Sequence, residues 1–166
     1  KSGAKVMNLL TKGSMNHLTH QLGKTPEQHF ADIKTVVEKA TAAGLSINVY
    51  LEDWSNGMRN SQDYVLAFID FLATLPIKRI LFPDTLGVLT PSETYLFIKA
   101  IRNNHPDLHF DFHAHNDYDL SIANVMEALR AGVNGLHLTV NGMGERTGNA
   151  PLASAIAVIN DFMPDF

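Results

Sequence analysis

Two histidines separated by one residue, within the run Phe112–Asp117, are the strongest candidates for chemistry in this chain. The alternating stretch before them, Leu108–Asp111, predicts a β-strand. Because successive side chains of a strand point to opposite faces, His113 and His115 are expected on the same side. Two imidazoles held in this way suit a divalent metal, with polar packing inside the domain as the alternative.

A second polar segment, Asn141–Asn149, points further toward an enzyme. Its glycines lack the spacing of nucleotide-binding loops and no Lys-Ser/Thr pair follows, which argues against phosphate binding. Glu145 and Arg146 are adjacent in this segment and either contact a substrate or pair with other loops. Asn149 has a structural alternative as the cap of a helix that begins near Pro151.

Three further positions are candidates because they also follow predicted strands. The segment Pro83–Gly87 is either a turn or a site in which Thr85 binds a substrate carboxylate and Asp84 joins a polar interior. Glu52 is either a solvated acid or a group that transfers protons. His17 follows the first predicted strand and is a second candidate for proton transfer. His29, His105 and His137 are interpreted as bystanders.

The elements that position these residues alternate short strands with helices of roughly 12 to 17 residues. The expected strands are Lys5–Leu10, Ser46–Leu51, Arg79–Phe82, Leu108–His113 and Gly135–Val140. Helix starts are indicated by Thr25-Pro26-Glu27-Gln28 and Thr90-Pro91-Ser92-Glu93, and helix ends by Gly44 and Gly132.

Two of the helices have predicted core faces. The first places Ile33, Val36, Val37 and Ala40 on one side, and the second places Val65, Phe68, Ile69 and Leu72 on one side.

Strand and helix alternation predicts a parallel α/β sheet, either open and doubly wound or closed as a (β/α)8 barrel. Every predicted strand leads into a polar segment, and a barrel collects all of these loops on one face. An open sheet would build its site mainly at one switch point. The distribution therefore favours a barrel. Five strands are about five-eighths of one, so the chain is expected to be part of a longer protein.

Composition excludes several other classes. The chain has 166 residues and no cysteine, which rules out disulfides, thiol nucleophiles and cysteine-ligated metals. The net charge of -4 is not gathered into blocks, so neither a nucleic-acid surface nor a membrane-binding face is predicted. With no apolar run of about 18 residues and no signal peptide, the cytoplasm is the expected location.

The pair of segments Phe112–Asp117 and Asn141–Asn149, with His115 and Asn149 34 residues apart, resembles the signature of the 2-isopropylmalate synthase and homocitrate synthase family. These enzymes are Claisen-type acyltransferases of the DRE-TIM metallolyase superfamily. Similar segments run in order along the chain: Ser14–His17, Thr25–Glu27, Glu52-Asp53 and Pro83–Gly87.

The resemblance implies a partial (β/α)8 TIM barrel, roughly from strand 3 to helix 7, with residues 1–166 forming part of one catalytic domain. The first two βα units, the last unit and any C-terminal domain are then outside the chain. By the same resemblance a divalent cation (zinc, manganese or magnesium) is held by His113, His115 and Asn149. A fourth ligand, an Asp beside an Arg on the first strand, has no counterpart here.

The implied reaction joins the acetyl group of acetyl-CoA to an α-keto acid, with the cation as Lewis acid. Glu52 and His17 are the expected proton-transfer residues, and Thr85, Asp84, Glu145 and Arg146 the expected substrate contacts. The first expectation is 2-oxoisovalerate giving 2-isopropylmalate in leucine biosynthesis. Homocitrate and citramalate synthases are alternatives.

Other possibilities are a metal-dependent lyase or aldolase of the superfamily, or an isolated fragment without activity. A lyase that uses a glycine-loop cysteine does not fit a chain without cysteine. The family also implies a homodimer for the full-length protein. The 166 residues alone are expected to be inactive, because the first-strand Asp is missing.

Overall fold

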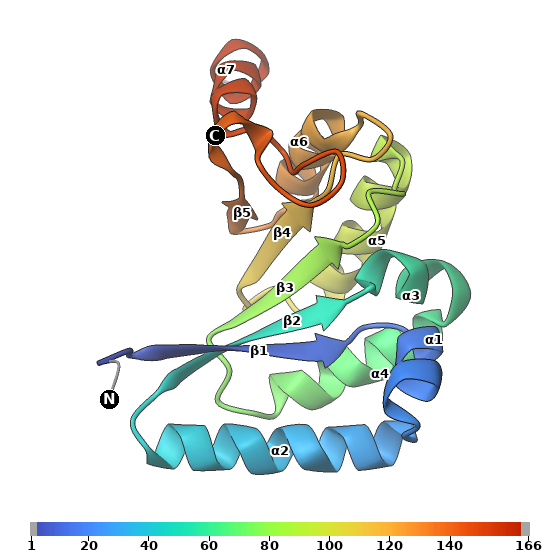
Figure 1. Ribbon diagram of the computed structural model, residues 1–166, viewed down its shortest axis with the longest axis vertical. Coiled ribbons are helices and arrows are strands. Elements are labelled where there is room, and N and C mark those ends of the chain that lie inside the picture. Colours follow the sequence, from blue (N-terminus) through green and yellow to red (C-terminus); the bar gives the residue numbers. More distant parts are fainter. Residues whose placement is uncertain (1–2, 164–166) are drawn as a thin grey trace. The chain divides into compact units, whose positions relative to one another are not determined.

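The computed structural model describes residues 3–163 and divides the chain into two compact units, Lys1–Phe82 and Pro83–Phe166 (Figure 1). The first unit contains β1 (Val6–Lys12), α1 (Met15–His17), a π-helical turn (Leu18–Leu22), α2 (Pro26–Ala42), β2 (Ser46–Glu52), α3 (Trp54–Asn60), α4 (Gln62–Ala73) and most of β3 (Arg79–Asp84). The second contains α5 (Pro91–Asn104), β4 (Phe110–Ala114), α6 (Ser121–Ala131), β5 (Gly135–His137), a 3-10 turn (Val140–Gly142) and α7 (Leu152–Phe162).

In the first unit, parallel pairing places the ends of β1 and β2 side by side. The register runs from Val6 opposite Ser46 to Lys12 opposite Glu52. Along β2 every second side chain, Ile47, Val49 and Leu51, is completely buried. Helices α2 and α4 lie on the same side of these strands in Figure 1. Glu52 belongs to the other set of alternating side chains, which is only half-buried.

The two predicted helix starts are confirmed. Thr25 and Thr90 each cap a helix with a reciprocal capping box, completed by Gln28 and Glu93, and a proline occupies the first turn. This arrangement satisfies backbone N–H groups that the helix itself leaves without partners.

The predicted core faces are nearly right. All four positions of the second helix (α4) are buried, as are Ile33, Val37 and Ala40 of α2. Val36 is 38% exposed, so its assignment to the core was wrong. It lies at the margin of the apolar stripe formed by Ile33, Val37 and Ala40.

In the second unit, β4 and β5 pair in parallel, with His113 opposite His137. Strand β5 ends at His137, three residues before the predicted end at Val140. The backbone turns there, because Asn141 and Gly142 adopt left-handed conformations (φ 57° and 67°). The end of the predicted strand instead forms a turn and an isolated bridge from Thr139 to Pro151.

The five strands follow chain order, β1-β2-β3-β4-β5, and the registers described above are parallel. This confirms the predicted α/β class and agrees with successive βα units of a barrel. Among residues 3–163, no helix combines the length and apolarity needed to span a bilayer.

Candidate active site

The two histidines of the second unit lie on one side of β4, as predicted. His113 is within the strand and His115 directly follows it. Their Nε2 atoms are 3.3 Å apart, and their ring planes are nearly perpendicular at 89°. The backbone N–H of His115 donates to the carbonyl of Asp84 at 3.3 Å, which fixes the chain just beyond the strand end.

This spacing fits two ligands of one cation. Imidazole nitrogens bind zinc at about 2.0–2.1 Å, so two of them at tetrahedral or right angles lie about 2.9–3.4 Å apart. Burial, with smaller contributions from the neighbouring His115 and His137, lowers the pKa of His113 to about 4. Burial also lowers the pKa of His115, with a smaller contribution from Arg146. Both rings are therefore neutral near pH 7, which is the form that binds metals.

Asn149 lies beside this pair. Its backbone forms an antiparallel bridge with His115, and its side-chain Oδ1 is buried with no hydrogen-bond partner. Its Nδ2 donates to the carbonyl of Met143 at 3.4 Å. The alternative role as a helix cap is not realised, since α7 begins at Leu152 after Pro151. A buried carbonyl oxygen without a donor is available to a cation.

Gly144 can approach Asn149 closely because glycine has no side chain. A Cβ atom at residue 144 would lie 2.6 Å from Asn149 Nδ2, so any other residue would displace the carboxamide. Residues 3–163 contain no group of three or more His, Cys, Asp or Glu arranged to hold a metal ion. The donors that fit are therefore two imidazole nitrogens and one carboxamide oxygen.

The loop that carries Asn149 is fastened by Arg146. Its guanidinium donates to both oxygens of Asp117, from Nε at 2.7 Å and from Nη2 at 2.8 Å, and also to the carbonyl of Thr85 at 2.9 Å. The ion pair lowers the pKa of Asp117 and raises that of Arg146. Arg146 thus joins three loops, which is the loop-pairing alternative to substrate contact.

The other predicted substrate contacts differ in their surroundings. Asp84 is completely buried, and its carboxylate accepts the backbone N–H groups of Val88 (3.1 Å) and Leu89 (3.0 Å), as expected of a turn. Thr85 follows it and is half-buried. Glu145 is exposed, two residues after Met143.

In the first unit, Glu52 pairs with Lys12 on the adjacent strand. The side chains of Lys12 and Glu52 are 15% and 24% exposed, respectively. The backbone at Lys12 is held from two helices: its N–H donates to Nε2 of His29 at 3.2 Å, and its carbonyl accepts from the Tyr64 hydroxyl at 2.6 Å. The candidate proton-transfer carboxylate is therefore accompanied by an ammonium group whose position is well fixed.

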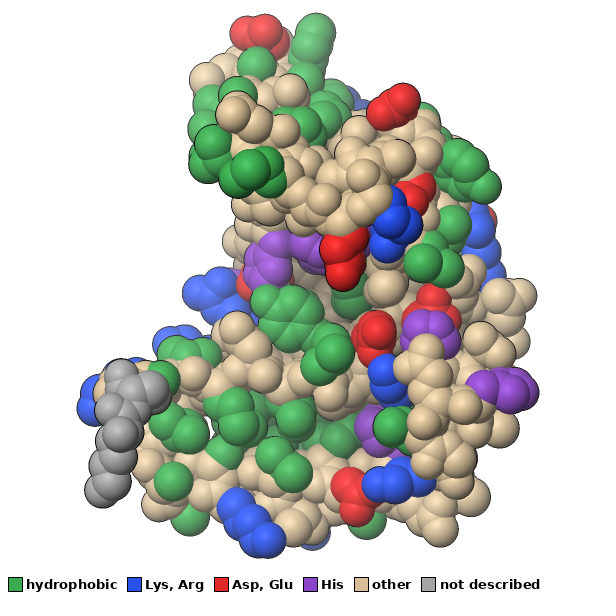
Figure 2. All heavy atoms as spheres, in the orientation of Figure 1, with side chains coloured by type: hydrophobic (Ala, Val, Ile, Leu, Met, Phe, Trp, Pro, Cys, Tyr) green, Lys and Arg blue, Asp and Glu red, His purple; other side chains and the backbone are tan. Residues whose placement is uncertain are grey.

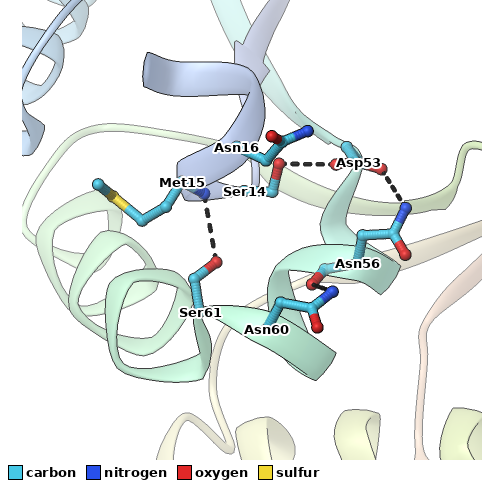
Figure 3. A pocket seen from close by; sticks show the side chains of 7 residues that line it. All are labelled: Ser14, Met15, Asn16, Asp53, Asn56, Asn60 and Ser61. Carbon is cyan, nitrogen blue, oxygen red and sulfur yellow. Dashed lines mark hydrogen bonds between the residues drawn. The ribbon is translucent and has the colours of Figure 1, made fainter. Parts of the chain in front are cut away.

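His17 lies near a buried carboxylate, with its Nε2 3.6 Å from Asp53 Oδ2. Ser14 donates to the same oxygen at 2.6 Å, and Asn56 donates to Oδ1 at 2.8 Å (Figure 3). A cavity of about 350 Å³ opens beside this network. Its lining residues, shown in Figure 3, are Ser14, Met15, Asn16, Asp53, Asn56, Asn60 and Ser61.

Sequence reasoning missed two residues beside the histidine pair. Asp111 occupies the same face of β4 two residues before His113, a spacing that was visible in the sequence. His137, interpreted as a bystander, lies opposite His113 in the register of β4 and β5, which the sequence does not show. In Figure 2, histidine side chains gather where β4 and β5 lie in Figure 1.

Comparison with known proteins agrees with the resemblance. A homocitrate synthase of Sulfolobus acidocaldarius is 34% identical over 146 residues, covering 88% of this chain and 31% of that protein. A protein of Methanopyrus kandleri named as an (R)-citramalate synthase is 31% identical over 159 residues, covering 95% of this chain and 31% of its own length. The chain thus spans about a third of these relatives.

Solved structures of low identity confirm the fold. Hydroxymethylglutaryl-CoA lyase from Pseudomonas aeruginosa superposes with a TM-score of 0.81 at 20% identity, covering 96% of this chain and 56% of that one. The Bacillus subtilis HMG-CoA lyase gives 0.83 at 19% identity, with 95% and 56% covered. The partial TIM-barrel prediction is therefore confirmed. Residues 1–162 match the HMGL-like family, and the chain belongs to that family, within the DRE-TIM superfamily.

Proposed function

We propose that this chain carries part of the active site of an acyltransferase that condenses acetyl-CoA with an α-keto acid. The observation that carries the proposal is the geometry at the end of β4: two neutral imidazoles with Nε2 atoms 3.3 Å apart, and the buried, unpartnered Oδ1 of Asn149 beside them. The family and the names of the relatives support the same chemistry.

His113, His115 and Asn149 would hold a divalent cation, which supplies Lewis-acid polarisation of the keto group when bound. The Thr85 hydroxyl is placed by the same loop system and would donate to a substrate carboxylate. Arg146 keeps that loop in position through the carbonyl of Thr85. Exposed Glu145 remains a candidate substrate contact, whereas Asp84 would act by shaping the loop.

Glu52 would accept a methyl proton of acetyl-CoA, and His17 is the second candidate for proton transfer. The ammonium of Lys12 pairs with the Glu52 carboxylate, the form that acts as a base. Asp53 faces His17 and would hold its ring in a fixed orientation.

For the substrate, we infer a keto acid without a second charged group, with 2-oxoisovalerate first and pyruvate second. Lys12 and Arg146, the cations nearest the candidate residues in each unit, are paired with Glu52 and Asp117. Each pair leaves little charge for a further carboxylate. Homocitrate carries a third carboxylate, so its precursor would need a cation other than Lys12 and Arg146. The product would then be 2-isopropylmalate.

The test is release of coenzyme A, followed with a thiol reagent, when the full-length protein that contains this chain is incubated with acetyl-CoA, Mn²⁺ and one keto acid at a time. Release with 2-oxoisovalerate, exceeding that with pyruvate and 2-oxoglutarate, is the expected result. Faster release with 2-oxoglutarate would overturn the substrate assignment and leave the condensation intact.

Two controls bear on the reaction class. The variant Glu52→Gln should lose most of the release while retaining the cation, since it lies outside the donor set. Turnover of the keto acid without acetyl-CoA would contradict the condensation and indicate a lyase or aldolase instead.

A further inference from the structure

We propose that Asp111 is a positioning residue of the candidate metal centre and that it acts through His137. The inference rests on the proposed function, because it requires that His113 and His115 hold a cation. It concerns groups on β4 and β5 that the proposed reaction does not otherwise use.

The carboxylate of Asp111 is built into the fold. The residue is 1% exposed, and its two oxygens contact different imidazoles: Oδ1 lies 2.8 Å from His109 Nε2, and Oδ2 lies 3.3 Å from His137 Nε2. A carboxylate only accepts hydrogen bonds, so both nitrogens must donate. The ring of His137 is therefore oriented by a buried and immobile anion.

His137 in turn borders the metal ligand. It is the register partner of His113 across β4 and β5, and the two ring centroids are 6.0 Å apart at an interplanar angle of 64°. The ring of His137 thus packs against the ring of His113. With His137 held in place, the His113 ring cannot turn away from the point it shares with His115.

Gly135 provides the space that Asp111 needs. It lies opposite Asp111 in the strand register, and a Cβ atom there would be 2.3 Å from Asp111 Oδ1. The backbone at Gly135 is not left-handed, so the reason for glycine at this position is space and not conformation. Alanine at residue 135 would push the Asp111 carboxylate out of place. The variant Gly135→Ala therefore moves Asp111 without changing its chemical identity.

His109, which contacts Oδ1 of Asp111, allows a positioning role to be distinguished from a contribution to core stability alone. His109 contacts Asp111 as His137 does, but it lies just before β4, four residues from His113 along the chain. If Asp111 acts through His137, removing His109 should leave the cation site intact. If Asp111 only stabilises the core, loss of either histidine should have similar effects.

The experiment is titration of the purified protein with Co²⁺ alone, followed by calorimetry and by the visible ligand-field spectrum. We expect Asp111→Asn and His137→Ala each to weaken Co²⁺ binding about 10- to 100-fold, the range measured for groups that orient metal ligands. Gly135→Ala should weaken it in the same direction. His109→Ala should stay within about threefold of the parent, and Asp111→Asn with His137→Ala should be no weaker than His137→Ala alone.

Several results would overturn the inference. One is Co²⁺ affinity in Asp111→Asn and His137→Ala equal to that of the parent. Another is a loss of affinity in His109→Ala as large as in His137→Ala. The third is a double variant in which the two single losses multiply. Should Asp111→Asn fail to fold by circular dichroism, His137→Ala decides, because it leaves the carboxylate in place. A parent that does not bind Co²⁺ would overturn the proposed function as well, whereas a binding parent with unaffected variants overturns this inference alone.

Discussion

The two units treat their buried polar groups differently. In the first unit, the carboxylates of Glu52 and Asp53 receive donors from side chains of the same unit, Lys12 for one and Ser14 and Asn56 for the other. In the second unit, the Nδ1 atoms of His113 and His115 and the Oδ1 of Asn149 are buried without hydrogen-bond partners. The two carboxylates are satisfied within the fold, whereas the imidazoles and the carboxamide each keep a buried atom without a partner.

The difference indicates which of these groups chiefly stabilise the fold and which remain available to a ligand. A satisfied buried network contributes to folding, because removing one member leaves the others unpaired. A buried polar atom without a partner lowers stability and persists where a ligand will satisfy it. Substitution of Asp53 should therefore mainly affect folding, and substitutions at the histidine pair should mainly affect cation binding.

The largest expected effect is at His113. Replacing it by phenylalanine removes one of two imidazole donors, so affinity for a divalent cation should fall by about 100-fold or more. The free energy of unfolding should change little, because the apolar ring removes a buried Nδ1 without a partner but also the Nε2 contact with His115. Calorimetric titration with Zn²⁺ and urea unfolding measure the two quantities.

The matched control is His20→Phe, which changes an exposed histidine. It should leave cation affinity within twofold of the parent. Cation binding by His113→Phe at the parental affinity would show that the donor set is wrongly assigned.

The opposite pattern is expected at Asp53. Asp53→Ala leaves Ser14 and Asn56 without their acceptor, and it places alanine in a left-handed backbone conformation (φ 64°). The free energy of unfolding should therefore fall by about 3 kcal/mol. Asparagine tolerates that conformation and keeps one acceptor oxygen, so Asp53→Asn should lower the free energy of unfolding by about 1 kcal/mol. Neither should change cation affinity. A large loss of affinity in Asp53→Asn would break the contrast between the units.

Acid should destabilise the molecule through neutral buried histidines in both units. Burial lowers the pKa of His29 to about 4, and it accepts a backbone hydrogen bond as the neutral ring. The unfolded chain binds the proton near pH 6.5, so this stability is present above that pH and is lost as pH falls toward 4, by at most about 3 kcal/mol. His113 acts in the same direction.

Urea unfolding at several pH values measures this loss. His29→Gln should flatten part of the pH dependence. A saturating divalent cation should add stability near neutral pH through the second unit and leave the His29 contribution unchanged. An undiminished pH slope in His29→Gln would show that other groups carry the acid sensitivity.

The smallest effect is expected at Arg146. Arg146→Lys removes the two-pronged contact with Asp117 but keeps the charge. The pair is largely solvent-exposed, so the free energy of unfolding should fall by less than about 1 kcal/mol. Cation affinity should fall only severalfold, through loosening of the Asn149 loop. Thermal unfolding and Co²⁺ titration measure both, and an unchanged affinity would show that the loop holds its shape without this contact.

Local chemistry made much of the fold predictable. Capping residues at Thr25 and Thr90 act within four residues of sequence, and the period-2 pattern placed His113 and His115 on one face. The end of β5 was wrong, because the apolar run to Val140 hides the turn that Asn141 and Gly142 impose.

The site was predictable only in part for a similar reason. Residues close in sequence were found, whereas contacts set by strand register or loop packing were not. His137 faces His113 because of how β4 and β5 align, and Arg146 reaches Asp117 across 29 residues. The prediction that residues 1–166 belong to one catalytic domain stays a prediction.

The 3.3 Å contact between the two Nε2 atoms has a consequence for the proton inventory of the site. Without a cation, two neutral rings at this distance share one N–H···N hydrogen bond, so one ring is protonated at Nε2 and the other at Nδ1. A shared cation needs both Nε2 lone pairs, which obliges the first ring alone to exchange its tautomer. Nitrogen-15 NMR should then show one imidazole changing its protonated nitrogen on loading while the other keeps it.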